Sequence, residues 1–322
     1  MYEAFYGLSE KPFSTLPDPD FIYWGRAHKM AFAMLEYGIL NHAGFTVVTG
    51  GIGCGKTTLI CHLLKHLDDD VTVGLVSNTR RAAGDLLRWV MMSLGQPYEQ
   101  GSVVALHQEF QDFLIGEYAS NRRTLLIVDE AQNLGMETLE ELRMLSNINF
   151  GKDQLLQIVL VGQPQLKELL QRPELVQFAQ RISSDFHLQP LAPREVGHYI
   201  AHRLQLAGST RRLFSPNAAA MIAEASQGVP RSINILCDTA LVYGFSSGAR
   251  AISVRIVKDV IEDKRRYGLF PPSGHDDTGP ANVIAHPAPA RHGAAREAGS
   301  VGIAPDDDGY DRERQNFHIQ QK

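Results

Sequence analysis

The chain has 322 residues, of which 44% are hydrophobic, and it carries a formal net charge of −5. This length suggests about two folded units, and the acidic balance excludes a protein that binds nucleic acid over most of its surface, because such proteins usually carry excess basic charge. With three cysteines, no CxxC pair, no leader pattern and no run of about 20 apolar residues, the composition argues against a disulfide-bonded or membrane-spanning chain and predicts a cytoplasmic protein.

The chain begins with a segment, residues 1–26, that is rich in aromatic residues and proline. Prolines at this density oppose a regular helix. The aromatic side chains predict a strap that packs on the following domain rather than a free tail. A helix is then predicted over 27–41, where apolar residues recur at near-helical spacing.

From residue 45 onward, strands and helices alternate. The expected strands cover 45–49, 71–77, 124–128, 155–161 and 186–191, and the expected helices cover 56–67, 82–94, 103–118 and 136–148. Apolar strands that alternate with helices indicate a parallel sheet covered on both faces. The sequence therefore predicts an α/β domain over residues 27–192.

After residue 192 the pattern becomes entirely helical. Helices are expected over 195–206, 216–225, 232–246 and 253–264, and they predict a small all-α lid domain over 193–268. From 269 to 322 the composition shifts to glycine, proline, alanine, histidine and aspartate. Such a segment cannot bury enough apolar surface to offset the entropy of ordering it, so this tail is expected to be disordered.

The strongest motif is a glycine-rich loop that follows the strand 45–49 and opens the helix 56–67, which is the context a P-loop requires. Its glycines let backbone N–H groups turn toward phosphate oxygens, and the helix N-terminus adds positive potential. Lys56 is expected to reach the β- and γ-phosphates of ATP, and Thr57 to ligate Mg²⁺. The residues expected to contact the nucleotide are Gly50, Gly51, Ile52, Gly53, Cys54, Gly55, Lys56, Thr57 and Thr58.

Two adjacent carboxylates, Asp129 and Glu130, directly follow the apolar strand 124–128. Burying carboxylates is costly, so the pair needs a reason. Beside a P-loop, Asp129 is expected in the Mg²⁺ shell, and Glu130 is expected to polarise the attacking water as a general base. A glutamate here favours hydrolysis over transfer to a substrate hydroxyl. The alternative is an exposed turn with helix-capping acids.

Six motifs in order give the chain a resemblance to a known family. The phosphate loop, the acidic motif 126–132 and the motif 228–234 together look like an AAA+ ATPase. The opening residues 5–13 and 17–19, with 141–147 and 160–164, resemble the ExeA/GspA type (general secretion pathway protein A). The resemblance covers about residues 1–265, and it implies a P-loop NTPase sheet followed by a helical lid.

The resemblance implies further catalytic residues. Gln163 matches the sensor that orients the attacking water, and Arg231 matches a second sensor on the lid, over the γ-phosphate. Arg181 matches an arginine finger that completes the ATP site of a neighbouring subunit, with Arg172 as the competing candidate. Asn78 sits where the family often has a residue that restrains the catalytic glutamate.

The resemblance also implies a homo-oligomeric ring that uses ATP turnover to drive envelope secretion or exopolysaccharide export. Its partners would be secretion or polysaccharide-export proteins, through which it would associate with the inner membrane. Members of the secretion branch continue into a membrane span and a peptidoglycan-binding domain; neither pattern follows here, which favours the shorter, soluble branch linked to exopolysaccharide and exosortase systems. The alternatives are an ATP-dependent, DNA-binding transposition regulator, which is not favoured, and a slow nucleotide-gated recruitment switch.

Overall fold

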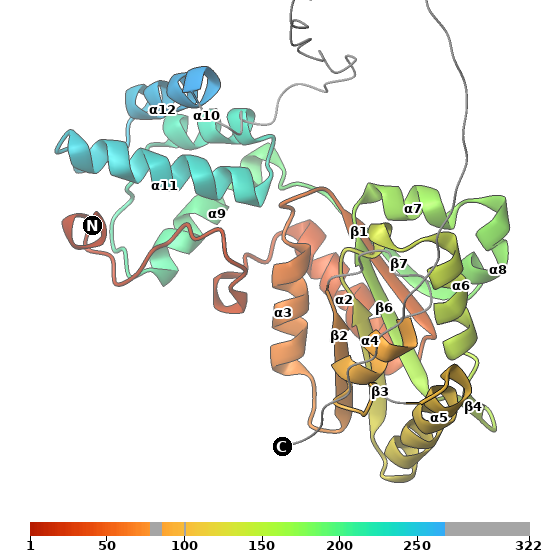
Figure 1. Ribbon diagram of the computed structural model, residues 1–322. Helices are drawn as coiled ribbons and strands as arrows, with labels where there is room; N and C mark the ends of the chain where they lie inside the picture. Colours follow the sequence, from red (N-terminus) through yellow and green to blue (C-terminus); the bar gives the residue numbers. More distant parts are fainter. Residues whose placement is uncertain (78–85, 100, 268–322) are drawn as a thin grey trace, which may run out of the picture. The chain divides into compact units, whose positions relative to one another are not determined.

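Five parallel strands form the central sheet of the computed structural model, in the order β2-β3-β6-β1-β7 (Figure 1). Because all five strands are parallel, the segments that follow β1, β3 and β6 all begin at the same edge of the sheet, where the carboxyl ends of the strands lie. The predicted α/β fold class is confirmed. The strands are β1 (Phe45–Gly50), β2 (Val71–Val76), β3 (Arg123–Val128), β6 (Leu156–Gly162) and β7 (Ile182–Leu188).

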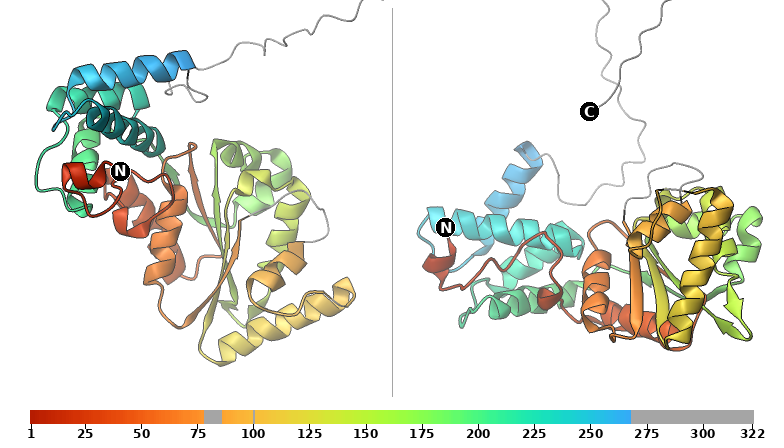
Figure 2. Two further views of the ribbon diagram at one scale, coloured as in Figure 1. Left: turned by 60° about the vertical axis from the view of Figure 1, so that its left-hand side comes forward. Right: turned by 60° about the horizontal axis from the view of Figure 1, so that its bottom comes forward.

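Helices cover both faces of this sheet (Figure 2). The strands supply both cores because successive side chains point to opposite faces: Val47 of β1 joins one core and Val48 joins the other. One face is covered by α2 (Arg26–Leu40) and α3 (Lys56–His66). The other is covered by α4 (Leu86–Ser93), α5 (Val103–Ala119), α6 (Met136–Leu145), α7 (Pro164–Leu170) and α8 (Val176–Ala179).

The structure describes residues 1–77, 86–99 and 101–267. Asn78, the first residues of the helix predicted over 82–94 and the tail predicted over 269–322 lie outside this part of the chain. None of the described helices is long and apolar enough to cross a membrane.

Several short elements were not predicted, and the bounds of one predicted strand are wrong. The strand predicted over 186–191 is β7, which runs from Ile182 to Leu188. Three consecutive polar residues, from Ser183 to Asp185, follow Ile182 and hid its start. At its other end, Pro190 lacks the N–H group that a longer ladder would need. The unpredicted elements are the hairpin of β4 (Asn149–Phe150) and β5 (Asp153–Gln154), α7, α8, α1 (Glu3–Tyr6), and the 3-10 turns η1 (Pro19–Phe21), η2 (Ala131–Asn133) and η3 (Pro173–Leu175).

Four helices follow the sheet and enclose a core of their own. They are α9 (Pro193–Leu206), α10 (Pro216–Ser226), α11 (Pro230–Ser246) and α12 (Val254–Tyr267). The strap was expected to pack on the α/β domain that follows it, and its last residues do so, since Ile22 is buried in the core under α2 and α3 and Trp24 packs against that core. Its earlier residues Tyr6, Phe13 and Phe21 are instead buried in the core of these later helices. Sequence order did not reveal this second contact, since the partner helices lie about 180 residues away along the chain.

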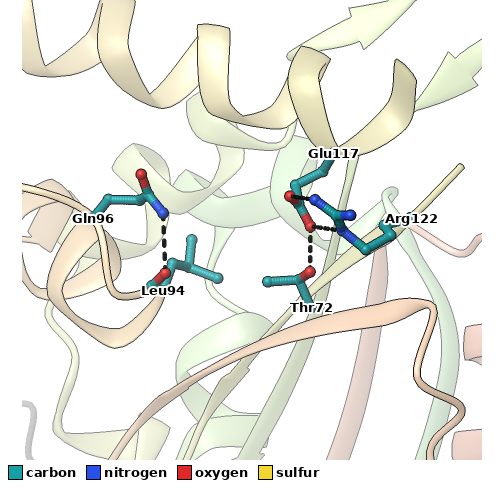
Figure 3. Close-up of polar contacts among 5 residues, drawn as sticks. All are labelled: Thr72, Leu94, Gln96, Glu117 and Arg122. Carbon is teal, nitrogen blue, oxygen red and sulfur yellow. Dashed lines mark hydrogen bonds and ion pairs between the residues drawn. The ribbon is translucent and has the colours of Figure 1, made fainter. Parts of the chain in front are cut away.

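An ion pair between the buried Glu117 and the exposed Arg122 fixes the end of α5 against the sheet (Figure 3). Glu117 is 7% exposed and accepts hydrogen bonds from both the guanidinium of Arg122 and the hydroxyl of Thr72 in β2. Nearby, the side-chain amide of Gln96 donates to the Leu94 carbonyl at 3.3 Å, which closes the turn after α4. The donors from Arg122 and Thr72 satisfy the Glu117 carboxylate, whose burial would otherwise be costly.

Candidate active site

A cavity of about 240 Å³ lies at the edge of the sheet where β1, β3 and β6 end. On the sheet side it is lined by the loop after β1, by Glu130 after β3 and by Gln163 after β6. Its other walls are strap residues between Ser14 and Tyr23 and side chains of α9 and α11. Segments that lie far apart in the sequence therefore meet around one space.

The loop between β1 and α3 has the backbone of a phosphate cradle. Gly53 and Gly55 adopt φ angles of 78° and 96°, which residues with side chains rarely adopt. The Lys56 ammonium donates to the carbonyl oxygens of Gly50 (2.8 Å) and Gly51 (3.1 Å). A curled loop that ends at a helix N-terminus, with a lysine folded against it, can bind the oxygens of a phosphate chain.

His28 of α2 supports this loop and is not among the predicted site residues. Its Nε2–H donates to the Cys54 carbonyl at 3.0 Å, and a Cβ on Gly55 would lie 3.0 Å from the same nitrogen. Burial lowers the pKa of His28, so the ring stays neutral at pH 7. A signal was present in the sequence, since a histidine stood on the same helix face as the apolar Ala31 and Leu35.

Asp129 is buried directly after β3, against the first turn of α3. Its Oδ2 accepts from the Thr57 hydroxyl at 3.2 Å, and its Oδ1 accepts from the Glu130 backbone N–H at 2.8 Å. Burial is the main cause that raises the pKa of Asp129, and the Glu130 carboxylate adds to it, while the hydrogen bonds and the Lys56 ammonium act in the opposite direction. Burial therefore makes the ionised form of this carboxylate unfavourable unless a cation binds it.

The oxygens of Thr57 and Asp129 are of the hard type that Mg²⁺ prefers. Within the described residues, no group of three or more histidine, cysteine, aspartate or glutamate side chains is placed to hold a metal ion by itself. This donor set fits a Mg²⁺ ion that is bound jointly by the protein and by a phosphate chain, because Mg²⁺ usually takes only one or two carboxylates and keeps its other positions for phosphate and water.

Glu130 lines the cavity and is held by two amides. Its backbone has a left-handed φ of 54°, which is uncommon for a residue other than glycine. Its Oε2 accepts from the side-chain amides of Gln132 and Gln163, the latter at 3.1 Å. The backbone N–H of Gln163 in turn donates to Oε1 of Gln132 at 2.9 Å. Gln132 lies in the motif 126–132 but is not among the predicted site residues.

Arg231, in the first turn of α11, approaches the phosphate loop. Its backbone N–H donates to the Gly53 carbonyl at 3.2 Å, and a Cβ on Gly53 would lie only 2.7 Å from the Cβ of Arg231. Glycine at this position therefore lets α11 come close. Arg231 and Lys56 both line the cavity, so two cationic side chains from different parts of the chain face one site.

The strap wall of the cavity is held by Arg203 of α9, which is 6% exposed. Its Nε donates to the Pro12 carbonyl at 2.6 Å and its Nη2 to the Ser14 carbonyl at 3.4 Å. Its guanidinium lies 4.7 Å from the centre of the Phe21 ring, and in the described part of the chain no carboxylate forms an ion pair with it. Asn234 of α11 adds a hydrogen bond of 2.9 Å to the Ser14 carbonyl.

The two arginines predicted to act on a neighbouring subunit do not line this cavity. Arg181 directly precedes β7, at the opposite edge of the sheet, and its Nη1 donates to the Ser146 hydroxyl at 3.2 Å. Arg172 is exposed, and its Nη1 lies 3.9 Å from the sulfur of Met136. The candidate Asn78 lies outside the described residues.

The sheet side of the cavity lies within a segment that matches a known protein family. A family model described as an AAA domain matches residues 39–170, which include the phosphate loop, Asp129, Glu130 and Gln163. The chain contains an AAA domain. The AAA domain thus contributes the sheet side of the cavity, while the strap, α9 and α11 lie beyond the matched residues.

The AAA domain belongs to a longer stretch of similarity. The chain is 39% identical, over 253 residues, to General secretion pathway protein A of Aeromonas hydrophila. The alignment covers 78% of this chain and 46% of that protein, so the chain spans about half the length of this curated relative. The resemblance to AAA-type ATPases of the GspA kind is confirmed.

Solved structures share the fold of the chain. They include Drosophila ORC bound to DNA (TM-score 0.61, 16% identity, 81% of this chain and 65% of that chain) and Cdc6p of Pyrobaculum aerophilum (TM-score 0.59, 16% identity, 77% and 71%). A third is the ORC2 protein of Aeropyrum pernix in its ADPNP-ADP complexes (TM-score 0.54, 17% identity, 73% and 66%). At these identities the likeness shows the fold alone.

Proposed function

We propose that this protein binds MgATP in the cavity at the carboxyl edge of the sheet and hydrolyses it there. The observation that carries the proposal is the hydrogen-bonded series from Thr57 through Asp129 to Glu130. It puts one buried carboxylate beside the phosphate loop and turns a second one toward the cavity. A phosphate loop alone accounts for nucleotide binding, whereas the second carboxylate supplies a base for hydrolysis.

In this proposal the loop residues 50–58 surround the phosphates of ATP. Lys56 exchanges its bonds to the Gly50 and Gly51 carbonyls for bonds to phosphate oxygens. When bound by Thr57, Asp129 and the phosphates, Mg²⁺ would neutralise charge that develops on the phosphate oxygens. Arg231 adds a second cation from α11, so that closure of the helical lid (193–268) over the α/β domain (27–192) depends on the γ-phosphate.

Glu130 then acts as the general base. It takes a proton from a water molecule as the water oxygen bonds to the γ-phosphorus, and the bond from that phosphorus to the bridging oxygen breaks, so ADP leaves with the electron pair. Gln163 orients the water beside Glu130, and Arg181 of an adjacent copy completes the charge stabilisation in an oligomeric ring. The proton ends on the Glu130 carboxylate, and a later exchange with solvent restores the base.

The similarity to General secretion pathway protein A supports a role for ATP turnover in envelope secretion. Because the chain covers 46% of that protein, its partners and substrate are carried over only as part of the proposal. We place the protein in the cytoplasm, peripheral to the inner membrane through secretion or exopolysaccharide-export proteins.

The substitution Glu130→Gln tests the catalytic part of this proposal, since it keeps the shape of the side chain and removes the base. We expect ATP affinity to change by less than about threefold and turnover at saturating ATP to fall by about 10²–10⁴-fold. Glu137→Gln, at an exposed acid in the first turn of α6, is the matched control and should keep full turnover. Unchanged turnover in Glu130→Gln would reject Glu130 as the base, and a wild-type protein without turnover would reject the hydrolase proposal.

A further inference from the structure

The carboxylate of Glu130 is held on one oxygen only. Both amide donors, from Gln132 and Gln163, reach Oε2. Among the described residues no donor reaches Oε1, although Glu130 lines the cavity. The carboxylate is therefore fixed through one oxygen, and the other is left to accept a proton.

Gln132 uses both ends of its amide to make this arrangement. Its Nε2 donates to Glu130, and its Oε1 accepts from the backbone N–H of Gln163 at 2.9 Å. Gln163 is the N-cap of α7 and follows β6, so Gln132 joins the end of β3 to the end of β6. A Cβ on Gly162 would lie 3.0 Å from Oε1 of Gln132, which shows how closely the end of β6 encloses this amide.

We propose that Gln132 is a positioning residue for ATP hydrolysis, which holds the Glu130 carboxylate in register with Gln163. This inference rests on the proposed function and assigns a role to a residue outside the predicted site. Only a side chain with a donor and an acceptor on one planar group makes both contacts. Leucine would remove both, and glutamate would keep the acceptor but replace the donor with a second carboxylate beside Glu130.

The role predicts a loss that falls on turnover rather than on binding. A general base that is displaced by about 1 Å loses roughly 10²-fold in rate, so Gln132→Leu should lower turnover by about 10–100-fold. The affinity for ADP should change by less than about threefold, because Gln132 does not line the cavity. Gln132→Glu keeps size and polarity and should show the same loss, which guards against a folding defect in the leucine variant.

The experiment compares wild type, Gln132→Leu, Gln132→Glu, Glu130→Gln and the control Gln165→Leu, which changes an exposed glutamine in the first turn of α7. Steady-state ATPase rates, the KM for ATP and the ADP affinity are measured for each. A second readout is the affinity for ADP in the presence of aluminium fluoride, which mimics the transferring phosphoryl group. We expect both Gln132 variants to lose this additional affinity and Gln165→Leu to keep it.

The outcomes are distinguishable. If wild type turns over ATP and Glu130→Gln does not, but the Gln132 variants match wild type in rate and in aluminium-fluoride affinity, the positioning role is wrong and the proposed function stands. Faster turnover in the variants also overturns it, since Gln132 would then restrain the base. If the Gln132 variants lose ADP affinity and thermal stability along with turnover, Gln132 has a structural role and the positioning role is wrong. A wild type without turnover would remove the proposed function and this inference together.

Discussion

The Thr57 hydroxyl donates to the Asp129 carboxylate, with 3.2 Å between the oxygen atoms, and this bond joins the first turn of α3 to the end of β3. The strands that lead to these residues, β1 and β3, are not neighbours, because β6 lies between them. The contact therefore depends on strand order as much as on either motif.

The first prediction concerns the burial of Asp129. Burial raises the pKa of this carboxyl group, so its ionised form destabilises the folded state, and this cost appears as pH rises through the raised pKa. Asp129→Asn removes the charge and keeps the shape. We expect the protein without nucleotide to gain about 1 kcal/mol in free energy of unfolding at pH 7, while Mg²⁺-dependent ATPase activity falls by at least about 10²-fold.

Urea unfolding and ATPase assays on the same preparations check this trade-off. Asp259→Asn, at an exposed position on α12, should change neither quantity. A destabilised Asp129→Asn variant would show that the ionised carboxylate is favourably paired in the fold, contrary to this account.

The second prediction concerns the strap wall. Arg203→Met keeps most of the length of the side chain, leaves the Pro12 carbonyl without its buried donor and leaves the Ser14 carbonyl with Asn234 alone. We expect the free energy of unfolding to fall by about 1–3 kcal/mol, and the KM for ATP to rise more than turnover falls, because the strap lines the cavity but not its catalytic side. Arg194→Met, at an exposed position on the same helix, is the control. A normal KM with lower stability would confine Arg203 to the helical core.

The third prediction concerns the pH dependence of stability. Hydrogen bonds from the Arg122 guanidinium, with that of the Thr72 hydroxyl, lower the pKa of Glu117 from its ordinary value of 4.5. A lowered pKa contributes stability above the ordinary value, and this contribution is lost as pH falls through the lowered one. Glu117→Gln should cost about 1–2 kcal/mol at pH 7 and clearly less at pH 3.

Urea unfolding of wild type and variant at the two pH values measures the difference. Glu109→Gln, at an exposed position on the same helix, should show no such pH dependence. An equal cost at both pH values would mean that packing at Glu117, rather than its charge, stabilises the end of α5.

The fourth prediction separates the two candidate arginine fingers by mixing subunits. Arg181→Ala should lose about 10³-fold or more in turnover, and Arg172→Ala should stay within about threefold of wild type. A Lys56→Ala variant has an inactive site but an intact finger. Mixing it with Arg181→Ala should restore part of the turnover. At a mixed interface, Arg181 of the Lys56→Ala subunit can complete the intact ATP site of the Arg181→Ala subunit.

If Arg172→Ala is the inactive variant and its turnover is restored by mixing with Lys56→Ala, the arginine finger is Arg172 and not Arg181. Full turnover in both arginine variants would remove the finger from the mechanism. Analytical ultracentrifugation with and without ATP tests in parallel whether the chain forms the proposed oligomer.

Local sequence patterns predicted the sheet well, since β1, β3 and β6 are mostly apolar runs that a solvent-exposed segment would not carry. The same patterns missed β7's early residues and the short elements around it, which are too brief or too polar to show a period. The contact of the strap with the later helices was not predicted, because aromatic composition predicts burial but says nothing about which distant helices provide it.

The sequence by itself determined the phosphate loop and the acidic pair, because both are chemical patterns within a few consecutive residues, bounded by a strand and a helix. Only the tertiary structure decided which other residues contact the loop, the acidic pair and the strap around the same cavity. Gln132 reaches both Glu130 and Gln163, His28 supports the loop, and Arg203 holds the strap. These contacts join segments that are brought together by strand order and core packing, and no local period or spacing encodes that proximity.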